Sequence, residues 1–211
     1  MVKKFHTKMN DIAAIVLAAG DSSRLGKPKQ LLRYRDESLI TALLNTVLES
    51  QINKVIVVLG AHADLIESEI EDLPVLIIKN QNWKYGISSS IRTGIQGVLN
   101  MAPLVEGTIL LVSDQPFVSV NLLNQLTAEK RRSGKGIIAC SYDGTVGTPV
   151  LFDNSYFKQL GELDGKKGAK QLIEKYPADV EVIPFPLGHI DIDTQEDYNR
   201  LRQDQTASKV K

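Results

Sequence analysis

Short apolar runs alternate, through the first half of the chain, with segments whose apolar residues recur every three or four positions. The runs are apolar without interruption, which is typical of strands buried on both faces of a parallel sheet. We expect such strands over residues 12–17, 55–59, 75–79 and 108–112. The segments between them predict a helix capped by Ser38 and further helices over 63–71 and 88–100. This alternation predicts an α/β fold whose mostly parallel sheet is covered by helices on both faces.

The pattern changes past Ser133. Short strands punctuated by glycine follow, near residues 137–140 and 150–152. We expect them to form a small antiparallel edge or insertion that carries substrate contacts.

The chain reads as one domain. Its 211 residues suffice for a substantial core, and no internal repeat, low-complexity segment or linker divides them. We expect a single domain over 1–211 with its core at about 11–201. The polar ends, before Asp11 and after Gln203, are expected to fray.

Charge and cysteine content narrow the class of protein. Acidic and basic side chains balance at 25 each, so we expect no nucleic-acid partner and no anionic membrane partner.

No apolar stretch approaches the roughly 20 residues of a membrane span. Lys3 and Lys4 precede an apolar run as in a signal peptide, but polar residues separate them from that run. The lone Cys140 lies in an apolar strand, where we expect a small buried hydrophobe, and it suits a reducing cytoplasm.

The segment 17–29, after the first predicted strand, combines small residues with cations. Small residues let the backbone approach a ligand closely, and free N–H groups can bind phosphate oxygens. Arg24, Lys27 and Lys29 would neutralise a triphosphate, above all when charge builds on a departing pyrophosphate. The segment therefore indicates a phosphate-binding loop, although a solvated Gly/Ser turn with incidental lysines has the same composition.

Two familiar phosphate-binding motifs do not match this loop. A P-loop needs four residues between its glycines and Ser or Thr after its lysine, whereas five residues separate Gly20 from Gly26 and Pro28 follows Lys27. A dinucleotide fingerprint needs glycine where Ser22 stands.

Asp114 follows the fourth predicted strand, in a Ser-Asp-Gln-Pro context. The carboxyl ends of parallel strands are where open α/β sheets bind ligands, and a carboxylate there can hold Mg²⁺. A turn or helix-capping aspartate is the alternative.

A second acidic segment, 191–197, lies near the C-terminus. Thr194 and Asp197 match a capping box that opens a helix. Asp191 and Asp193 lie on one side of an extended stretch before it, which leaves them available for a metal. We favour Asp193 over Asp191 as the ligand, and we expect it to lie close to Asp114.

The segment 80–94 is the third candidate. Asn80 follows a strand, and a run of serines opens a helix whose N-terminus favours anions. Helix capping explains these serines about as well as ligand binding does.

The loop resembles the L-A-A-G-x-S-x-R-[ML]-G-x-x-K signature of the MobA-like nucleotidyltransferases, from Leu17 to Lys29. That resemblance implies a Rossmann-like three-layer α/β/α fold and an Mg²⁺-dependent enzyme that uses an NTP. Guanylyltransferases of this kind usually carry Gly-Gly where this chain has Ala19-Gly20, and the Ala-Ala-Gly form is commoner among enzymes that use CTP.

Further segments resemble the molybdenum cofactor cytidylyltransferases within that family. The segment 80–94 is similar to their Asn-Pro-x-Trp-x-x-Gly-…-Ser-Ser-Leu-Arg-x-Gly stretch, and 147–152 to their Gly-x-Pro-x-x-Phe element. Residues 165–169 are similar to their Gly-Asp-Lys-Gly-Ala, but Lys166 replaces the acidic residue, which puts any metal or substrate role of that position in doubt. The likeness spans about residues 11–201.

The resemblance implies transfer of CMP from CTP to a molybdopterin-type cofactor, with release of pyrophosphate, in the maturation of a molybdenum hydroxylase apoenzyme. It implies catalysis by Arg24, Lys29 and Asp114, and Mg²⁺ on Asp114 with Asp193 or Asp191. The acceptor would contact Gly147, Pro149 and Lys167. The nucleotide would contact Leu17, Ala18, Ala19, Gly20, Ser22, Arg24, Lys29, Asn80 and Ser89.

Two other functions remain open at this point. One is a CTP- or UTP-dependent transferase acting on a sugar or polyol phosphate. The other is an accessory protein that binds the nucleotide and delivers a cofactor to a molybdenum hydroxylase without catalysis. Pyrophosphate release separates the second from an enzyme.

Overall fold

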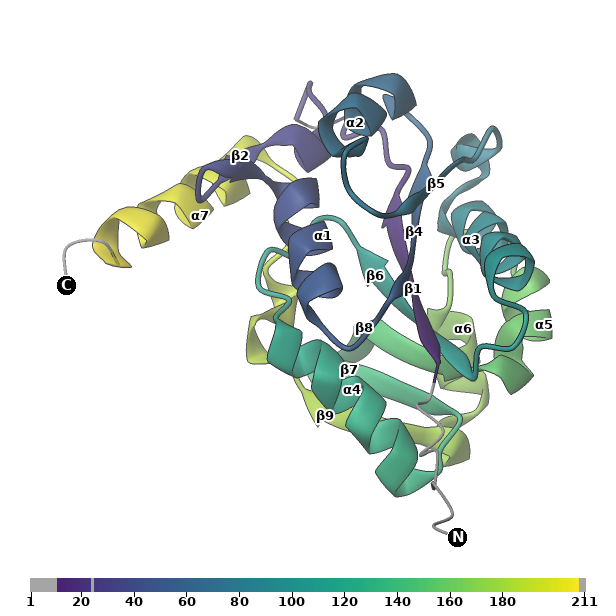
Figure 1. Cartoon of the computed structure of the whole chain (residues 1–211). Coiled ribbons are helices and arrows are strands. Elements are labelled where there is room, and N and C mark those ends of the chain that lie inside the picture. The colour runs from purple at the N-terminus through teal and green to yellow at the C-terminus, as the bar shows by residue number, and fades with distance from the viewer. Residues whose placement is uncertain (1–10, 24, 209–211) are drawn as a thin grey trace, which may run out of the picture.

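A seven-stranded mixed sheet forms the centre of the molecule (Figure 1). The computed structural model describes residues 11–23 and 25–208, with side chains through Arg202. The strand order is β5-β4-β1-β6-β8-β7-β9. The strands are β1 (Ile12–Ala18), β4 (Lys54–Leu59), β5 (Leu76–Lys79), β6 (Gly107–Val112), β7 (Ile137–Tyr142), β8 (Thr145–Asp153) and β9 (Val180–Pro184).

The first four of these strands run parallel, as predicted. β1 lies between β4 and β6 and pairs with both, while β5 pairs with β4. Every residue of β1 is buried, which explains why its apolar run has no polar interruption. The predicted α/β fold with a mostly parallel sheet is therefore confirmed, and the carboxyl ends of β1, β4, β5 and β6 meet at one edge.

Helices cover both faces of the sheet (Figure 1). One face carries α1 (Leu39–Glu49), α2 (Ala63–Ile70) and α4 (Val120–Ser133), and the other carries α3 (Ile87–Met101), α5 (Phe157–Gly161) and α6 (Lys170–Lys175). Successive side chains of a strand point to opposite faces, so β1 serves both cores. Its Ala14 and Val16 pack with α1, whereas Ile15 and Leu17 pack with α3.

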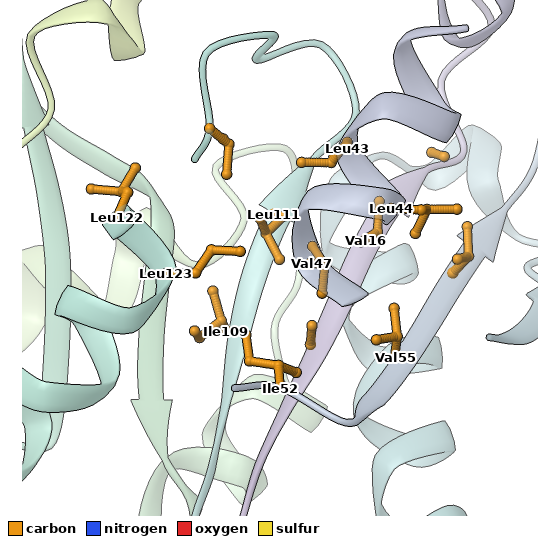
Figure 2. Packing of buried hydrophobic residues seen from close by; sticks show 14 of the residues in the cluster. Val16, Leu43, Leu44, Val47, Ile52, Val55, Ile109, Leu111, Leu122 and Leu123 are labelled. Carbon is orange, nitrogen blue, oxygen red and sulfur yellow. The ribbon is translucent and has the colours of Figure 1, made fainter. Parts of the chain in front are cut away.

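Apolar side chains of α1 and α4 fill the first of these cores (Figure 2). Leu43, Leu44 and Val47 project from α1 onto Val16 and its neighbours in the sheet. Ser38 caps this helix, because its side chain accepts a hydrogen bond from the Thr41 N–H, as predicted.

The predicted antiparallel strands after Ser133 are present, and they join the main sheet. β8 lies in the interior of the sheet, antiparallel to both β6 and β7. The edge strand is β9, parallel to β7. The small separate antiparallel unit is a hairpin of β2 (Arg33–Tyr34) and β3 (Glu37–Ser38).

The C-terminal helix α7 (Gln195–Ser208) packs at its start on this hairpin. Tyr198 donates a hydrogen bond from its hydroxyl to the Arg33 carbonyl, 2.9 Å away. The helix extends to Ser208, and the expected fraying after Gln203 stays a prediction. The same expectation for the N-terminal end concerns residues outside the described ones. Across the described part of the chain, no helix is both long and apolar enough to cross a bilayer.

Candidate active site

A cleft of about 310 Å³ opens at the carboxyl edge of the parallel strands. Its walls come from the segments after β1, β5 and β6, which the sheet brings together although they lie far apart in sequence. The pairing of β1 with β6 continues past the strand end, since the Ser113 N–H donates to the Leu17 carbonyl at 3.2 Å. The lining residues are Leu17, Ala19, Gly20, Asp21, Lys29, Gln30, Trp83, Lys84, Gly86, Ile87, Ser90, Val112, Ser113 and Asp114.

Gln30 holds the predicted phosphate loop in place. Its side chain is 1% exposed, and its Nε2 donates to the carbonyls of Ala18 and Gly20, at 3.2 Å and 3.4 Å. Burying an amide without hydrogen bonds would cost free energy, and these two bonds offset that cost. They also connect the loop to the short helix η1 (Lys29–Leu31), to which Gln30 belongs. Gln30 was not predicted as a site residue; its signal in the sequence is a polar residue directly before the apolar Leu31-Leu32 pair.

Ser22 shapes the other end of the loop. It adopts φ 52°, in the left-handed region, and its Oγ accepts a hydrogen bond from the Lys29 N–H at 3.0 Å. This contact closes the loop on itself and aims the Lys29 side chain at the end of β6. Arg24, predicted to bind phosphate, lies outside the described residues.

Lys29 connects the two predicted metal-binding aspartates. Its Nζ lies 2.6 Å from Asp114 Oδ2 and 2.7 Å from Asp193 Oδ1. Burial alone would lower the pKa of Lys29, but the charges and hydrogen bonds of Asp114, and then of Asp193, raise it above its ordinary value. The predicted proximity of Asp114 and Asp193 is confirmed, since the same ammonium contacts both carboxylates.

The segment before α7 carries the second carboxylate to this place. The Ile192 N–H donates to the Asp114 carbonyl at 3.2 Å, which holds the segment against the end of β6. Thr194 and Asp197 form the predicted capping box: Thr194 N–H donates to Asp197 Oδ2 at 2.9 Å, and Asp197 N–H donates to Thr194 Oγ at 3.2 Å. Helix capping thus holds Asp193 beside Lys29, although neither Asp193 nor Asp191 lines the cleft itself.

Asp191 lies in the same electrostatic field. Partial burial, followed by the negative charges of Asp114 and Asp193, raises the pKa of its carboxyl. One oxygen of Asp114, Oδ1, is buried and has no hydrogen-bond partner in the described part of the chain. Among the described residues, no group of three His, Cys, Asp or Glu is arranged as a complete metal site.

Asn80 and Ser89 are buried beside the cleft and are absent from its lining. The Asn80 amide donates to Ser89 Oγ at 2.9 Å and to Ser90 Oγ at 3.0 Å, while its oxygen accepts from the Asn82 N–H. These bonds fold the segment between β5 and α3, so that Trp83 and Ser90 face the cleft. The predicted contacts of Asn80 and Ser89 with the nucleotide stay predictions.

A second cavity of about 260 Å³ adjoins the cleft and shares Leu17, Ile87 and Val112 with it. Of the predicted acceptor residues, Gly147 and Lys167 line it. Pro149 follows a cis peptide bond from Thr148, and the lining includes its neighbours Thr148 and Val150. Lys170 adds a second ammonium to the lining, which the sequence analysis did not predict.

Three curated proteins resemble the chain over nearly its whole length. The purine catabolism protein PucB of Bacillus subtilis is 29% identical over 202 residues, covering 91% of this chain and 96% of PucB. Nicotine blue oxidoreductase of Paenarthrobacter nicotinovorans is also 29% identical, over 92% of this chain and 98% of that protein. The molybdenum cofactor cytidylyltransferase of Escherichia coli is 23% identical, over 90% and 95%.

The fold is also close to that of solved structures. The structure of Rv0371c from Mycobacterium tuberculosis matches with a TM-score of 0.79 and 29% identity, over 92% of this chain and 98% of that one. The same protein solved in complex with manganese matches with a TM-score of 0.73 and 28% identity, over the same shares of the two chains.

The family model for the MobA-like NTP transferase domain matches residues 14–180. That span contains the phosphate loop, Asp114 and both cavities' principal walls. The chain belongs to the MobA-like NTP transferase family.

Proposed function

We propose that this protein is an Mg²⁺-dependent cytidylyltransferase that transfers CMP from CTP to a molybdopterin-type cofactor and releases pyrophosphate. The observation that carries the proposal is the convergence of the phosphate loop, Lys29 and Asp114 on one cleft, with Asp193 bonded to Lys29 beside it. The name of the Escherichia coli relative supports the acceptor, and the Ala-Ala-Gly form of the loop supports CTP.

Each part of the loop has a role in this reaction. Its backbone N–H groups bind the triphosphate, and Lys29, with Arg24, binds the β- and γ-phosphates. A phosphate oxygen of the acceptor attacks the α-phosphorus, a new P–O bond forms, and the bond to pyrophosphate breaks. Because the attacking oxygen is already anionic, no general base is needed, and catalysis consists of positioning and charge neutralisation.

The carboxylates suit a hard divalent cation. Mg²⁺ in enzymes is usually bound by one or two carboxylates together with substrate phosphates and water. Two carboxylates from the protein are therefore enough for an Mg²⁺ site that the triphosphate completes. The buried, unpartnered Asp114 Oδ1 is an oxygen that such an ion would satisfy. Asp114 and Asp193 would hold Mg²⁺, with Asp191 nearby, and the ion would supply charge neutralisation at the α-phosphate. The manganese complex of Rv0371c supports a divalent metal in this fold.

The adjoining cavity suits the acceptor. Lys167 and Lys170 give it two positive charges for an anionic pterin phosphate, and it opens toward the cleft through shared residues. A molybdenum hydroxylase apoenzyme would receive the product.

The base preference rests on Ala19. This residue lines the cleft, and its carbonyl accepts a hydrogen bond from the Ala61 N–H at 3.1 Å, which fixes its position. Its methyl group narrows a site where glycine would leave room for a purine. One methyl rarely discriminates by more than about 10–200-fold, so some use of GTP is expected.

The test is pyrophosphate release with each of the four NTPs, with and without purified molybdopterin-type cofactor. We expect release with CTP and cofactor together, and little with either alone. Release with GTP in preference to CTP would refute the base assignment. Release with a sugar or polyol phosphate in place of the cofactor would refute the acceptor. Binding of CTP without release under any condition would identify an accessory protein.

A further inference from the structure

The ammonium of Lys29 lies between the carboxylates of Asp114 and Asp193, which we call the carboxylate pair. Its two distances, 2.6 Å and 2.7 Å, are those of charge-assisted hydrogen bonds. The Lys29 side chain is 14% exposed, so water screens these contacts only in part. The ammonium of Lys29 therefore neutralises the oxygens that the proposed function assigns to a metal.

The backbone of Lys29 is fixed while its ammonium can move. The Lys29 N–H donates to Ser22 Oγ, and the next residue, Gln30, is buried and bonded to the phosphate loop. The ammonium stands on a flexible four-carbon stem. Because that stem starts from the loop itself, the ammonium can turn from the carboxylate pair to a phosphate seated on the loop without any change in the backbone.

A divalent cation and the ammonium cannot share the carboxylate pair. An ion coordinated by Asp114 Oδ2 or Asp193 Oδ1 would lie within a few ångströms of Lys29 Nζ, since each oxygen is already in contact with it. Like charges at such separations repel strongly in a partly buried site. The metal therefore enters only when the ammonium leaves, and an incoming phosphate offers the ammonium a new partner.

We propose that Lys29 is a resident counter-cation, which keeps divalent metal off the carboxylate pair until a triphosphate draws its ammonium away. The inference rests on the proposed function, because it takes a triphosphate to be the ligand of the loop. It makes metal and nucleotide binding cooperative, and the coupling is reciprocal. The protein without nucleotide has a low affinity for metal because Lys29 competes for the same oxygens.

The experiment is a titration of the nucleotide-free protein with Mn²⁺, followed by the electron paramagnetic resonance signal of the free ion. Lys29→Gln removes the charge and keeps a side chain that can hydrogen-bond. We expect this variant to bind Mn²⁺ at least tenfold more tightly than the wild type. If the substitution only disrupted the structure of the site, the variant would bind Mn²⁺ more weakly than the wild type.

Lys27→Gln is the matched control. Lys27 belongs to the same loop, but its Nζ lies 5.5 Å from the centroid of the Tyr198 ring. Its removal changes the net charge by the same amount, and we expect Mn²⁺ affinity to change less than threefold. Lys29→Arg, which keeps the charge, should also stay near the wild-type value.

Several outcomes would overturn the proposal. They are an unchanged or weaker affinity in Lys29→Gln, an equal gain in Lys27→Gln, and absence of Mn²⁺ binding in every variant. Micromolar Mn²⁺ affinity of the nucleotide-free wild type would overturn it as well, and this arm needs no variant to fold. The titration contains no nucleotide and requires no turnover, so failure of the proposed function, seen as absence of pyrophosphate release, is a separate result.

Discussion

Asp114 is expected to contribute more to activity than to stability. One of its oxygens is bonded to Lys29, and the other is buried with no partner among the residues that the structure describes. An asparagine has the same shape and can still accept a hydrogen bond from Lys29, but a neutral amide is a poorer Mg²⁺ ligand. The residue is therefore better suited to ligand chemistry than to holding the fold.

We expect Asp114→Asn to fold and to lose at least a hundredfold in pyrophosphate release. Its free energy of unfolding, measured by urea denaturation, should change by no more than about 1–2 kcal/mol, because Lys29 keeps its bond to Asp193. Asp193→Asn should be milder, because the Asp193 side chain is more exposed, 30% against 19% for Asp114, so water can more readily take its place on a metal. Near-normal turnover in Asp114→Asn would remove this residue from the site.

Cys140 was predicted to be a small buried hydrophobe, and its side chain is indeed fully buried. Burial raises the pKa of its thiol from an ordinary value of 9.0 to about 12. The folded protein therefore favours the protonated thiol. The stability that this gives is complete below about pH 9, where the unfolded thiol is protonated too, and it is lost as pH rises from 9 toward 12.

We expect the free energy of unfolding to fall above pH 9 more steeply in the wild type than in Cys140→Ala. The difference in slope should approach about 1.4 kcal/mol per pH unit, which is the contribution of one thiol. Lysines and tyrosines titrate in both proteins, so the comparison isolates Cys140. Parallel pH profiles, measured by urea denaturation at fixed ionic strength, would contradict the assigned burial effect.

At the scale of elements, the sequence pattern was informative where burial is complete. β1, β4 and β6 are apolar on both faces, and their bounds agree with prediction within a residue or two. β9 was not predicted, because Glu181 interrupts its apolar run, whereas the edge strand β5, which is also only partly buried, was predicted from an unbroken apolar run. α4 was also missed, since its apolar positions cluster in its first half and its second half is charged.

The link between the phosphate loop and η1 was missed for a related reason. Gln30 acts through its side-chain amide, and a hydrogen bond to the carbonyls of Ala18 and Gly20 leaves no periodic trace in sequence. Pattern indicates where a loop binds phosphate, but not which buried side chain gives it its shape.

We expect Gln30→Met, which keeps the volume but removes both bonds, to lower the free energy of unfolding by about 1–3 kcal/mol. It should also raise the KM for the nucleotide more than it lowers kcat, because the loop backbone binds phosphate but does not react. Gln96→Met is the control, since Gln96 is exposed on α3 and bonds only to Asn100 in the contacts described. A KM equal to that of the wild type would show that the loop keeps its shape without Gln30.

At the scale of the whole molecule, topology assembles the site. Strand order places the ends of β1 and β6 side by side, so the proximity of the phosphate loop and Asp114 was predictable from the parallel sheet. Asp193 was harder to place, because the segment before α7 belongs to no strand and is held by one backbone bond to Asp114. That Lys29 stands between the two carboxylates depends on side-chain reach, which sequence spacing does not give.

The same topology gives the cleft an intrinsic reporter. Trp83 is the only tryptophan of the chain, and it lines the cleft together with Ala19 and Gly20 of the phosphate loop, from the short helix η2 (Trp83–Tyr85). Gly60, at the end of β4, has no room for a side chain: a Cβ there would lie 2.6 Å from Trp83 Cβ. Trp83 is thus fixed against the sheet, while its ring is near Lys84 Nζ, at 5.5 Å from the centroid.

We expect CTP with Mg²⁺ to change the fluorescence of Trp83 in a saturable way, because a nucleotide seated on the loop must displace water along this wall and can stack on or near the indole. The midpoint should match the affinity measured by calorimetry. Trp83→Phe keeps an aromatic wall and removes the signal, so it serves as the control for inner-filter effects of the nucleotide. Unchanged fluorescence at a CTP concentration that saturates the calorimetric signal would place the nucleotide away from the segment between β5 and α3. That result would also contradict the predicted nucleotide contacts of Asn80 and Ser89.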